Sequence, residues 1–374
     1  MGDFPLQFKE PFVPSNDVRS HYEHYPYPHY PLLSSVRKRD TYAMNLQALW
    51  ARFNGDFPES GEGRILIAGS GSFAPYPFAV ANPDAQVTAL DLSCANLRRA
   101  RLHCLVHGLR NVRFERGDLL DPTATPGPFH FIDSFGVLHH LDDPLAGLRA
   151  LERRLVPGGI LRLMVYGRYA RREAESIRCA VKRLGIKEIS DLRRLLAKAK
   201  PGSRVRNFIE ASWEARTDSG LADLFLHPCV HTYRIDEFLE MISQTRLEPL
   251  LFAHRGGLAD PAAEIARLRD LDRHRETPTN IICYLGLGTR GPCSPKEKRV
   301  LRVNPSLLST ISVPHLCAVQ VAPRLGFENQ LLDRSSRRFL RRFRIPMDAD
   351  NLTWEDKERV KRYLDALFLV ECRA

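Results

Sequence analysis

The sequence predicts a doubly wound α/β fold built on a mostly parallel sheet. A short apolar run without polar alternation, 65–68, is typical of a strand buried on both faces. Helical segments at 75–82, 93–107 and 144–155 separate the predicted strands. Strands and helices that alternate in this way favour a parallel sheet with helices on both sides.

The first strand leads directly into a glycine turn. Gly69 and Gly71 follow the run 65–68, and two glycines one residue apart permit a tight turn that a ligand can approach closely. A proline-started helix and a second strand come next, and that strand ends on Asp91. Strand, glycine turn, helix, strand and acid in this order are the layout of a nucleotide-binding βαβ unit, whose acid binds ribose hydroxyls.

The rest of the sheet is expected from later segments. Further strands are predicted at 112–115, 129–134, 160–166, 247–252 and 280–285. The Val-Pro-Gly-Gly segment 156–159 is expected to be a turn, and Ser93 and Ser190 are expected to cap helices. A final helix is predicted to begin after Thr353, with a start that resembles a capping box.

Three regions are expected along the chain. Residues 1–60 form an arm and helix, 61–289 form the α/β domain with a helical insert at 167–246, and 290–374 form a basic C-terminal extension. The arm holds the sequence Tyr-Glu-His-Tyr-Pro-Tyr-Pro at 22–28, whose prolines forbid a regular helix. Its aromatic rings either pack on the core or form a lid over a site.

Bulk composition narrows the functional classes. The 374 residues include 44% apolar residues, and no run approaches the ~18 apolar residues of a membrane span. The N-terminus lacks a basic start and an apolar signal core, so a cytoplasmic protein without a membrane partner is expected. The eight cysteines form no Cys-x-x-Cys pair, and no metal site is predicted.

The net charge of +11 is concentrated at the C-terminal end. Residues 290–374 carry 17 Lys and Arg against 10 Asp and Glu. Arg337 and Arg341, like Arg338 and Arg342, would pair on one helix face, where they could follow nucleic-acid phosphates. Solvated helix faces explain the same charges and are favoured.

Five segments in this order resemble the class I S-adenosylmethionine-dependent methyltransferases, with a Rossmann-like seven-stranded sheet. They are Ile-Leu-Ile-Ala-Gly-Ser-Gly-Ser, Ala-Leu-Asp-Leu-Ser, Gly-Asp-Leu-Leu, Phe-Ile-Asp-Ser-Phe-Gly-Val-Leu-His-His-Leu-Asp-Asp-Pro and Leu-Val-Pro-Gly-Gly-Ile-Leu-Arg-Leu, within residues 65–163. The resemblance is closest to bacterial members with a Tyr-Glu-x-x-Pro-Tyr-Pro arm and a Gly-Leu-Tyr-Ser-x-x-Ala-Arg-like stretch after the fifth strand, which residues 165–171 match here.

The resemblance implies a site for S-adenosylmethionine. It places the methionine portion against the glycine turn, the ribose on the acid after the second strand, the adenine near Gly-Asp-Leu-Leu, and the methyl end along the loop after the fourth strand. The residues so assigned to the cofactor are Gly69, Ser70, Gly71, Asp91, Leu92, Asp118, Leu119, Ser134, Phe135 and Gly136.

Position along the chain points to His139 as the general base, if the acceptor must lose a proton, with His140 pointing elsewhere. The alternative is that both histidines have a structural role, either capping the following helix or packing under the loop. Weaker candidates for contact with the substrate come from the arm, the fifth strand and the insert. They are Tyr22, Tyr25, Tyr27, Tyr166, His227 and Tyr233.

Two positions depart from the pattern of the resembled family. Ile67 stands where an acid is usual, and Phe73 replaces the third glycine of the loop. The Val-Leu-His-His-Leu segment is common in enzymes that act on small molecules, so a small-molecule or natural-product methyl acceptor is predicted. An RNA- or protein-directed methyltransferase that uses the basic tail, and a degenerate binding protein in which Phe73 fills the cofactor pocket, remain the alternatives.

Overall fold

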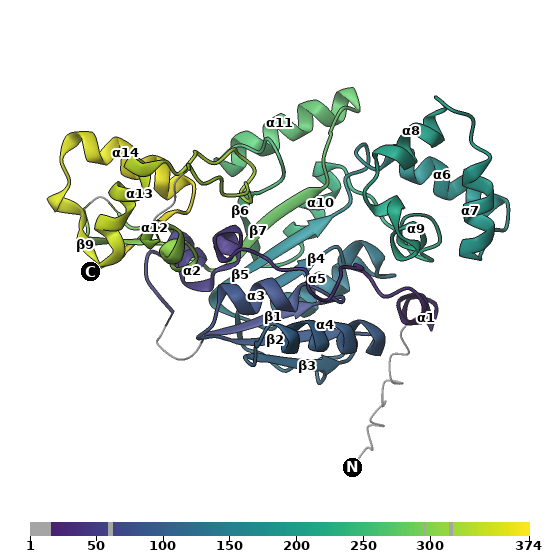
Figure 1. Cartoon of the computed structure of the whole chain (residues 1–374), viewed down its shortest axis with the longest axis horizontal. Coiled ribbons are helices and arrows are strands. Elements are labelled where there is room, and N and C mark those ends of the chain that lie inside the picture. The colour runs from purple at the N-terminus through teal and green to yellow at the C-terminus, as the bar shows by residue number, and fades with distance from the viewer. Residues whose placement is uncertain (1–15, 59–62, 295, 314–316) are drawn as a thin grey trace, which may run out of the picture.

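A seven-stranded sheet forms the centre of the molecule (Figure 1), in a computed structural model that describes residues 16–58, 63–294, 296–313 and 317–374. The strand order is β3-β2-β1-β4-β5-β7-β6, and within the described part of this sheet only β7 runs antiparallel to its neighbours. The strands are β1 (Arg64–Ala68), β2 (Gln86–Asp91), β3 (Val112–Arg116), β4 (Phe129–Phe135), β5 (Leu155–Val165), β6 (Leu247–Phe252) and β7 (Ile281–Leu287). The predicted doubly wound fold is confirmed.

Helices pack on both faces of the sheet because successive residues of each strand point to opposite sides. In β1, Ile65 and Ile67 join one apolar core, whereas Leu66 and Ala68 join the other. Side-chain caps start several of these helices; the Ser93 hydroxyl accepts the Asn96 N–H at 3.1 Å, as predicted. The helices are α2 (Leu46–Asn54), α3 (Pro75–Ala81), α4 (Cys94–Val106), α5 (Pro144–Glu152), α10 (Ile235–Ser243) and α11 (Pro261–His274).

The helical insert after β5 has a small core of its own, which includes Ile177, Leu192 and Phe225. It lies at one end of the molecule, and the C-terminal extension lies at the other (Figure 1). Its elements are α6 (Arg172–Arg183), α7 (Ile189–Ala197), α8 (Arg204–Ala211), the 3₁₀ turn η3 (Glu214–Arg216) and α9 (Asp218–Phe225).

The C-terminal extension shares its core with the central domain. Leu301 and Phe368 belong to the same buried cluster as Tyr42, Leu49 and Ile65. The extension therefore packs over one face of the sheet, and the 3₁₀ helix η1 (Lys38–Met44) and α2 belong to the same core. It contains the sheet β10-β8-β9 with β8 (Arg299–Val303), β9 (Met347–Asp348) and β10 (Leu369–Arg373), and the helices α12 (Leu308–Ser312), α13 (Arg334–Arg341) and α14 (Trp354–Asp365).

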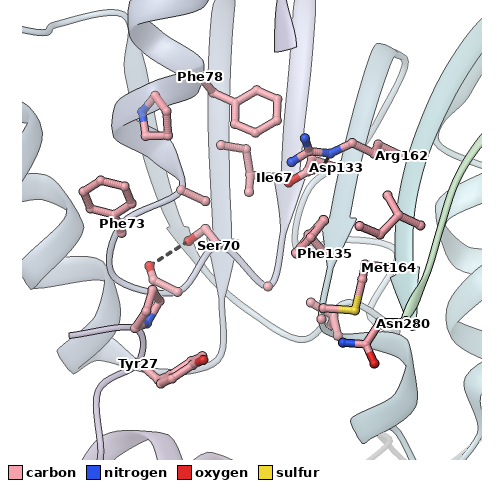
Figure 2. Close-up of a pocket in the computed structure, with 18 of the residues that line it drawn as sticks. Tyr27, Ile67, Ser70, Phe73, Phe78, Asp133, Phe135, Arg162, Met164 and Asn280 are labelled. Atoms are coloured by element: carbon pink, nitrogen blue, oxygen red, sulfur yellow. Dashed lines mark hydrogen bonds and ion pairs between the residues drawn. The ribbon is translucent and has the colours of Figure 1, made fainter. Parts of the chain in front are cut away.

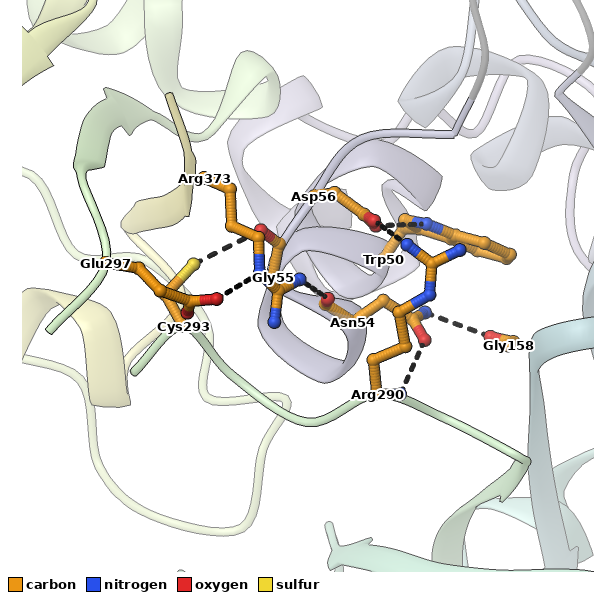
Figure 3. A network of polar contacts seen from close by, with 9 residues as sticks. All are labelled: Trp50, Asn54, Gly55, Asp56, Gly158, Arg290, Cys293, Glu297 and Arg373. Atoms are coloured by element: carbon orange, nitrogen blue, oxygen red, sulfur yellow. Dashed lines mark hydrogen bonds and ion pairs between the residues drawn. The ribbon is translucent and has the colours of Figure 1, made fainter. Parts of the chain in front are cut away.

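A polar network ties the extension to the end of α2 (Figure 3). The Asn54 side chain donates to the Gly158 carbonyl at 2.9 Å and accepts the Arg290 backbone N–H at 3.2 Å. The Arg373 guanidinium donates to the Asn54 carbonyl at 2.6 Å, and the Cys293 thiol donates to the Gly55 carbonyl at 3.1 Å. One asparagine thus joins α2, β5 and the chain that leads into the extension.

Three local expectations were wrong. The segment 156–159 is part of β5, because the positive φ of Gly158 (80°) is absorbed as an irregularity in the pairing with β4. The arm contains a helix, α1 (Asn16–His24), since the sequence has no proline between Pro14 and Pro26. Helix α7 begins one residue before Ser190, so that serine is not its cap.

Three of the four arginines that were expected to pair on a basic helix face are engaged inside the extension. Arg337 is buried and donates to the Cys317 carbonyl at 3.2 Å, and Arg341 donates to the Ile311 carbonyl. Arg342 makes a bidentate pair with Asp356 at 2.8–2.9 Å. Of the four arginines that could have followed phosphates, these three stabilise the fold of the extension.

Candidate functional site

A cavity of about 920 Å³ opens at the carboxyl ends of β1 and β4 (Figure 2). The strand order reverses between these two strands, and open α/β sheets bind ligands at such a switch point. The cavity runs on between the arm, the helical insert and the extension. Of the predicted residues, the structure places these in its wall: Tyr22, Tyr27, Gly69, Ser70, Gly71, Asp91, Leu92, Phe135, Gly136 and Tyr166.

The glycine turn has the conformation that the sequence predicted. Gly69 (φ 72°) and Gly71 (φ 56°) are both left-handed, a region that favours glycine. A Cβ at Gly69 would collide with the Val137 side chain, and a Cβ at Gly71 would lie 2.7 Å from the Tyr27 carbonyl oxygen. Part of the need for glycine therefore comes from the close approach of the chain's own arm, a contact that the sequence did not reveal.

Asp91 ends β2 with its carboxylate in the cavity wall. One oxygen accepts the Gly71 N–H at 2.7 Å, and the other accepts the Ser93 N–H at 2.9 Å and the Asn96 amide at 3.3 Å. Burial raises the pKa of the Asp91 carboxyl, and these hydrogen bonds oppose the rise. The acid is thus held in the cavity wall by donors on the glycine turn and at the start of α4.

Asp133 supplies a carboxylate beside the position where the resembled family has one. Ile67 of β1 lies in register with Asp133 of β4, which in turn lies in register with Arg162 of β5. Arg162 and Asp133 form a buried ion pair at 2.6 Å, and the guanidinium lies over the rings of Phe78 and Phe135 (Figure 2). The carboxylate therefore stands one strand away from its expected place, already paired.

Phe73 lines the cavity without filling it. Its ring packs against Tyr30 with 4.3 Å between centroids, and edge-on against His103 at 5.1 Å. Figure 2 shows it on the side of the glycine turn, away from Ile67 and Asp133. The third glycine of the usual loop is thus replaced by a ring that packs between the arm and α4.

The arm and the insert build a second wall from tyrosines and charged groups. The Tyr22 hydroxyl donates to Asp223 at 2.9 Å, and the Tyr27 hydroxyl donates to Glu214 at 3.2 Å. Glu214 also pairs with Arg171 at 3.0 Å. Burial raises the pKa of the Asp223 carboxyl to about 6. This arm–insert wall (Tyr22, Tyr27, Tyr166, Arg171, Glu214 and Asp223) faces the cavity as a unit.

The arm reaches this wall from the strand ends. The Tyr27 carbonyl accepts the Ser72 N–H at 3.0 Å, and the Tyr22 carbonyl accepts the Ser93 hydroxyl at 3.1 Å. The Glu23 carboxylate accepts the first backbone N–H groups of α4, at 2.7 and 3.1 Å. The Tyr-Glu pair of the arm is therefore an anchor as well as part of the site.

Three members of the arm–insert wall escaped prediction: Arg171, Glu214 and Asp223. Arg171 stands within the segment after the fifth strand that the resemblance singled out, so a signal existed for it. Glu214 and Asp223 sit in a helical insert whose charged residues are mostly solvated, and nothing in their spacing set them apart.

The two histidines after β4 lie opposite to the prediction. His139 is fully buried, stacks on Tyr166 at 3.7 Å and does not line the cavity, whereas His140 does. The predicted alternation does not apply, because Leu138–His140 is a 3₁₀ turn rather than extended chain. Burial lowers the pKa of His139 well below its usual value and that of His140 to about 4.

Other predicted residues also lie outside the cavity wall. Asp118 accepts the Leu120 N–H at 2.8 Å as a turn residue, and Leu119 is part of the apolar core. The Ser134 hydroxyl is buried without a hydrogen-bond partner in the described structure. Three weak substrate candidates, Tyr25, His227 and Tyr233, are likewise not in the lining.

The extension completes the cavity on the side away from the insert. A loop of the extension supplies Arg324 and Glu328 to the wall, beside Arg255 from the loop after β6. The Gly256 N–H donates to the Gly326 carbonyl at 2.6 Å, which fixes the two loops to each other. The extension is therefore a structural part of the site.

These features together define the class I methyltransferase fold: a glycine turn after β1, an acid after β2 and a cavity at the switch point. The family described as "Methyltransferase domain" matches residues 65–159. The central region therefore contains a methyltransferase domain at residues 65–159, in the fold that the resemblance implied.

Curated relatives match this chain over part of their length. An uncharacterized protein of Synechococcus sp. is 31% identical over 249 residues, which cover 64% of this chain and 60% of that protein. The ubiquinone biosynthesis O-methyltransferase of Xanthomonas campestris pv. campestris is 38% identical over 106 residues, 28% of this chain and 44% of that enzyme. The chain thus spans less than two thirds of either curated relative.

Among solved structures, PKMT2 from Rickettsia typhi has a similar fold. It superposes with a TM-score of 0.55 at 15% sequence identity, over 92% of this chain and 77% of that one. The same protein in complex with AdoHcy gives a TM-score of 0.54. Within the part of the chain described by the structure, no helix is both long and apolar enough to cross a membrane.

Proposed function

We propose that this protein transfers a methyl group from S-adenosylmethionine to a small-molecule acceptor. The observation that carries the proposal is the convergence of the Gly69–Gly71 turn and the Asp91 carboxylate on one cavity at the switch point. This is the place and the chemistry expected for an adenosyl ligand. The methyltransferase-domain match over residues 65–159 supports the same reaction.

The residues present fit this cofactor. The Asp91 carboxylate can accept ribose hydroxyls, the glycine turn leaves the backbone open to the methionine portion, and Phe135 and Gly136 line the end where β4 stops. When bound, the cofactor supplies an electrophilic methyl group on a sulfonium. The chain itself would contribute positioning and the exclusion of water, which account for up to about 7–11 kcal/mol of barrier reduction in favourable cases.

The shape of the cavity favours a small acceptor. Its volume of about 920 Å³ falls within the ~300–1,000 Å³ of small-molecule sites. Arm, insert and extension each supply part of its wall, so an acceptor in the cavity would contact all three. The RNA-directed alternative loses support, because Arg337, Arg341 and Arg342 are engaged within the extension.

Isothermal titration with S-adenosylmethionine and S-adenosylhomocysteine tests the proposal. Both should bind, and Asp91→Asn should weaken binding by about 10–100-fold, since a hydrogen bond to a charged group contributes about 1.5–3 kcal/mol. Asp84→Asn, an exposed residue just before β2, is the matched control and should bind like the unmodified protein.

Absence of binding heat, together with absence of protection against thermal unfolding, would contradict the proposal. The acceptor is then sought by incubating the protein with a small-molecule cell extract and methyl-labelled cofactor. Transfer of label to a low-molecular-weight fraction is expected. Label found only in RNA or protein would refute the small-molecule part.

A further inference from the structure

The carboxylates in the cavity wall outnumber its guanidiniums. The wall contains Asp40, Asp91, Asp133, Glu214, Asp223 and Glu328, against Arg162, Arg171, Arg255 and Arg324. Arg162 is paired with Asp133 and Arg171 with Glu214. Asp223 is the most deeply buried carboxylate of the arm–insert wall, and among the described residues it has no ion-pair partner within 4 Å.

The surroundings of Asp223 stabilise its charge only in part. Its oxygens accept the Tyr22 hydroxyl at 2.9 Å and the Tyr166 hydroxyl at 3.5 Å. Arg171 acts on it from a distance, and its other charged or titratable neighbours include Tyr27, Glu214 and His21. Burial lowers the pKa of His21 to about 4. A buried carboxylate without a close cation is costly, and such groups concentrate at functional sites.

The same wall already holds one cation of the chain. The Arg171 guanidinium lies 3.7 Å from the centre of the Tyr166 ring and pairs with Glu214 at 3.0 Å. Aromatic faces combined with carboxylates are the usual recognition site for ammonium and guanidinium groups. The wall therefore has one carboxylate for each of two cations. Glu214 already pairs with Arg171, and Asp223 is available to a second cation.

Asp223 is also close to the proposed cofactor site. Tyr22 contacts Ser93 through its backbone and Asp223 through its hydroxyl. Asp223 is thus about the length of one tyrosine side chain from the loop that follows Asp91. Its other partner, Tyr166, follows β5, whose Met164 lies in register with Phe135 of β4. The carboxylate therefore stands beyond the strand ends where the methyl group is expected.

We propose that Asp223, together with the hydroxyls of Tyr22 and Tyr166, binds a protonated amine of the acceptor next to the transferred methyl group. This inference rests on the proposed function and narrows its acceptor to an amine. An ammonium cannot act as a nucleophile, and here its proton moves from nitrogen to a carboxylate oxygen of Asp223. The nitrogen keeps the electron pair of the broken N–H bond, and that lone pair is what an acceptor nitrogen needs.

Sinefungin tests this site without knowledge of the acceptor. It is an analogue of the cofactor with an ammonium group at the methyl position, whereas S-adenosylhomocysteine is uncharged there. Titration of both at pH 8 should show that the protein prefers sinefungin. Asp223→Asn should reduce that preference about tenfold or more, as expected for loss of a close, desolvated charge pair, and leave S-adenosylhomocysteine affinity within about threefold.

Glu210→Gln is the matched control, because it removes an exposed carboxylate of the insert that does not line the cavity. It should keep the full preference for sinefungin. In the unmodified protein the preference should be present at pH 8 and fade as the pH falls through about 6, where Asp223 becomes protonated. The pH series needs no substitution, so it tests the amine site even if the Asp223→Asn variant does not fold.

Equal affinity of the unmodified protein for the two ligands would overturn the amine site, as would a preference that survives in Asp223→Asn or is flat with pH. Binding of S-adenosylhomocysteine in those cases would leave the proposed function standing. Failure of S-adenosylhomocysteine and sinefungin alike to bind would instead overturn the proposed function and this inference with it.

Discussion

The two walls of the cavity differ in how the chain builds them. The strand-end wall, Gly69–Gly71, Asp91 and Phe135–Gly136, comes from short loops that each follow one strand of a rigid sheet. The arm–insert wall joins residues that are far apart in sequence, as in the pair of Tyr22 and Asp223, which are 201 positions apart. One wall is set by local geometry, and the other depends on long-range packing.

This difference separates the features of the site that follow from the fold from those that depend on the arm and the insert of this chain. The strand-end wall offers the features that an adenosyl ligand requires, and it follows from the fold. The arm–insert wall carries the tyrosines and carboxylates that would select an acceptor. Substitutions in the two walls should therefore affect different quantities, and the following predictions test that separation.

The largest effect is expected from Asp133→Asn, at the base of the strand-end wall. The change leaves the buried Arg162 without its counter-charge and should reduce the free energy of unfolding by about 3–5 kcal/mol, as measured by urea denaturation. Asp270→Asn, which breaks an exposed pair with Arg273, should cost less than about 1 kcal/mol. Equal losses would show that the Asp133 pair is not effectively buried.

An intermediate effect is expected from Gly71→Ala, where the two walls meet. Both this change and its control, Gly108→Ala, force a left-handed alanine at a strain of about 1–2 kcal/mol. Only at Gly71 does the new Cβ meet another backbone atom, the Tyr27 carbonyl at 2.7 Å. Titration should show that Gly71→Ala binds S-adenosylhomocysteine about tenfold more weakly, whereas Gly108→Ala binds it like the unmodified protein. Similar affinities of the two variants would mean that the arm does not shape the cofactor site.

The smallest effect is expected from Tyr27→Phe, within the arm–insert wall. The variant loses one hydrogen bond, to Glu214, and should lower the free energy of unfolding by about 0.5–1.5 kcal/mol. Its affinity for S-adenosylhomocysteine should stay within about threefold of the unmodified protein, because the Tyr27 backbone that contacts the glycine turn is retained. A larger loss of affinity would contradict the separation of the two walls.

The sequence was most informative where structure and function are both local. Strand, glycine turn and acid predicted β1, β2 and the position of Asp91 in the cavity, since each depends on a few neighbouring residues. The turn at 156–159 was wrong because a glycine with positive φ can also sit within a strand, and only the partner strand decides which occurs. His139 was misplaced relative to the cavity because a 3₁₀ turn replaced the assumed alternation.

The residues that sequence reasoning missed depend on tertiary contacts. Asp223 gains its importance from burial against Tyr22 and Tyr166, and neither burial nor partner is visible in the insert's own pattern. The extension, expected from its composition as a separate basic region, shares a core with η1 and α2 and supplies Arg324 and Glu328 to the cavity. Such roles follow from packing rather than from a motif.

Tyr27 of the arm contacts both walls of the cavity. Through its backbone, Tyr27 lies on the glycine turn, and through its hydroxyl it reaches Glu214 of the insert. On the proposed function, any movement of this segment away from the glycine turn would open the nucleoside side and the acceptor side of the cavity together. Release of the used cofactor and access of the next acceptor to the cavity would then be coupled in each turnover.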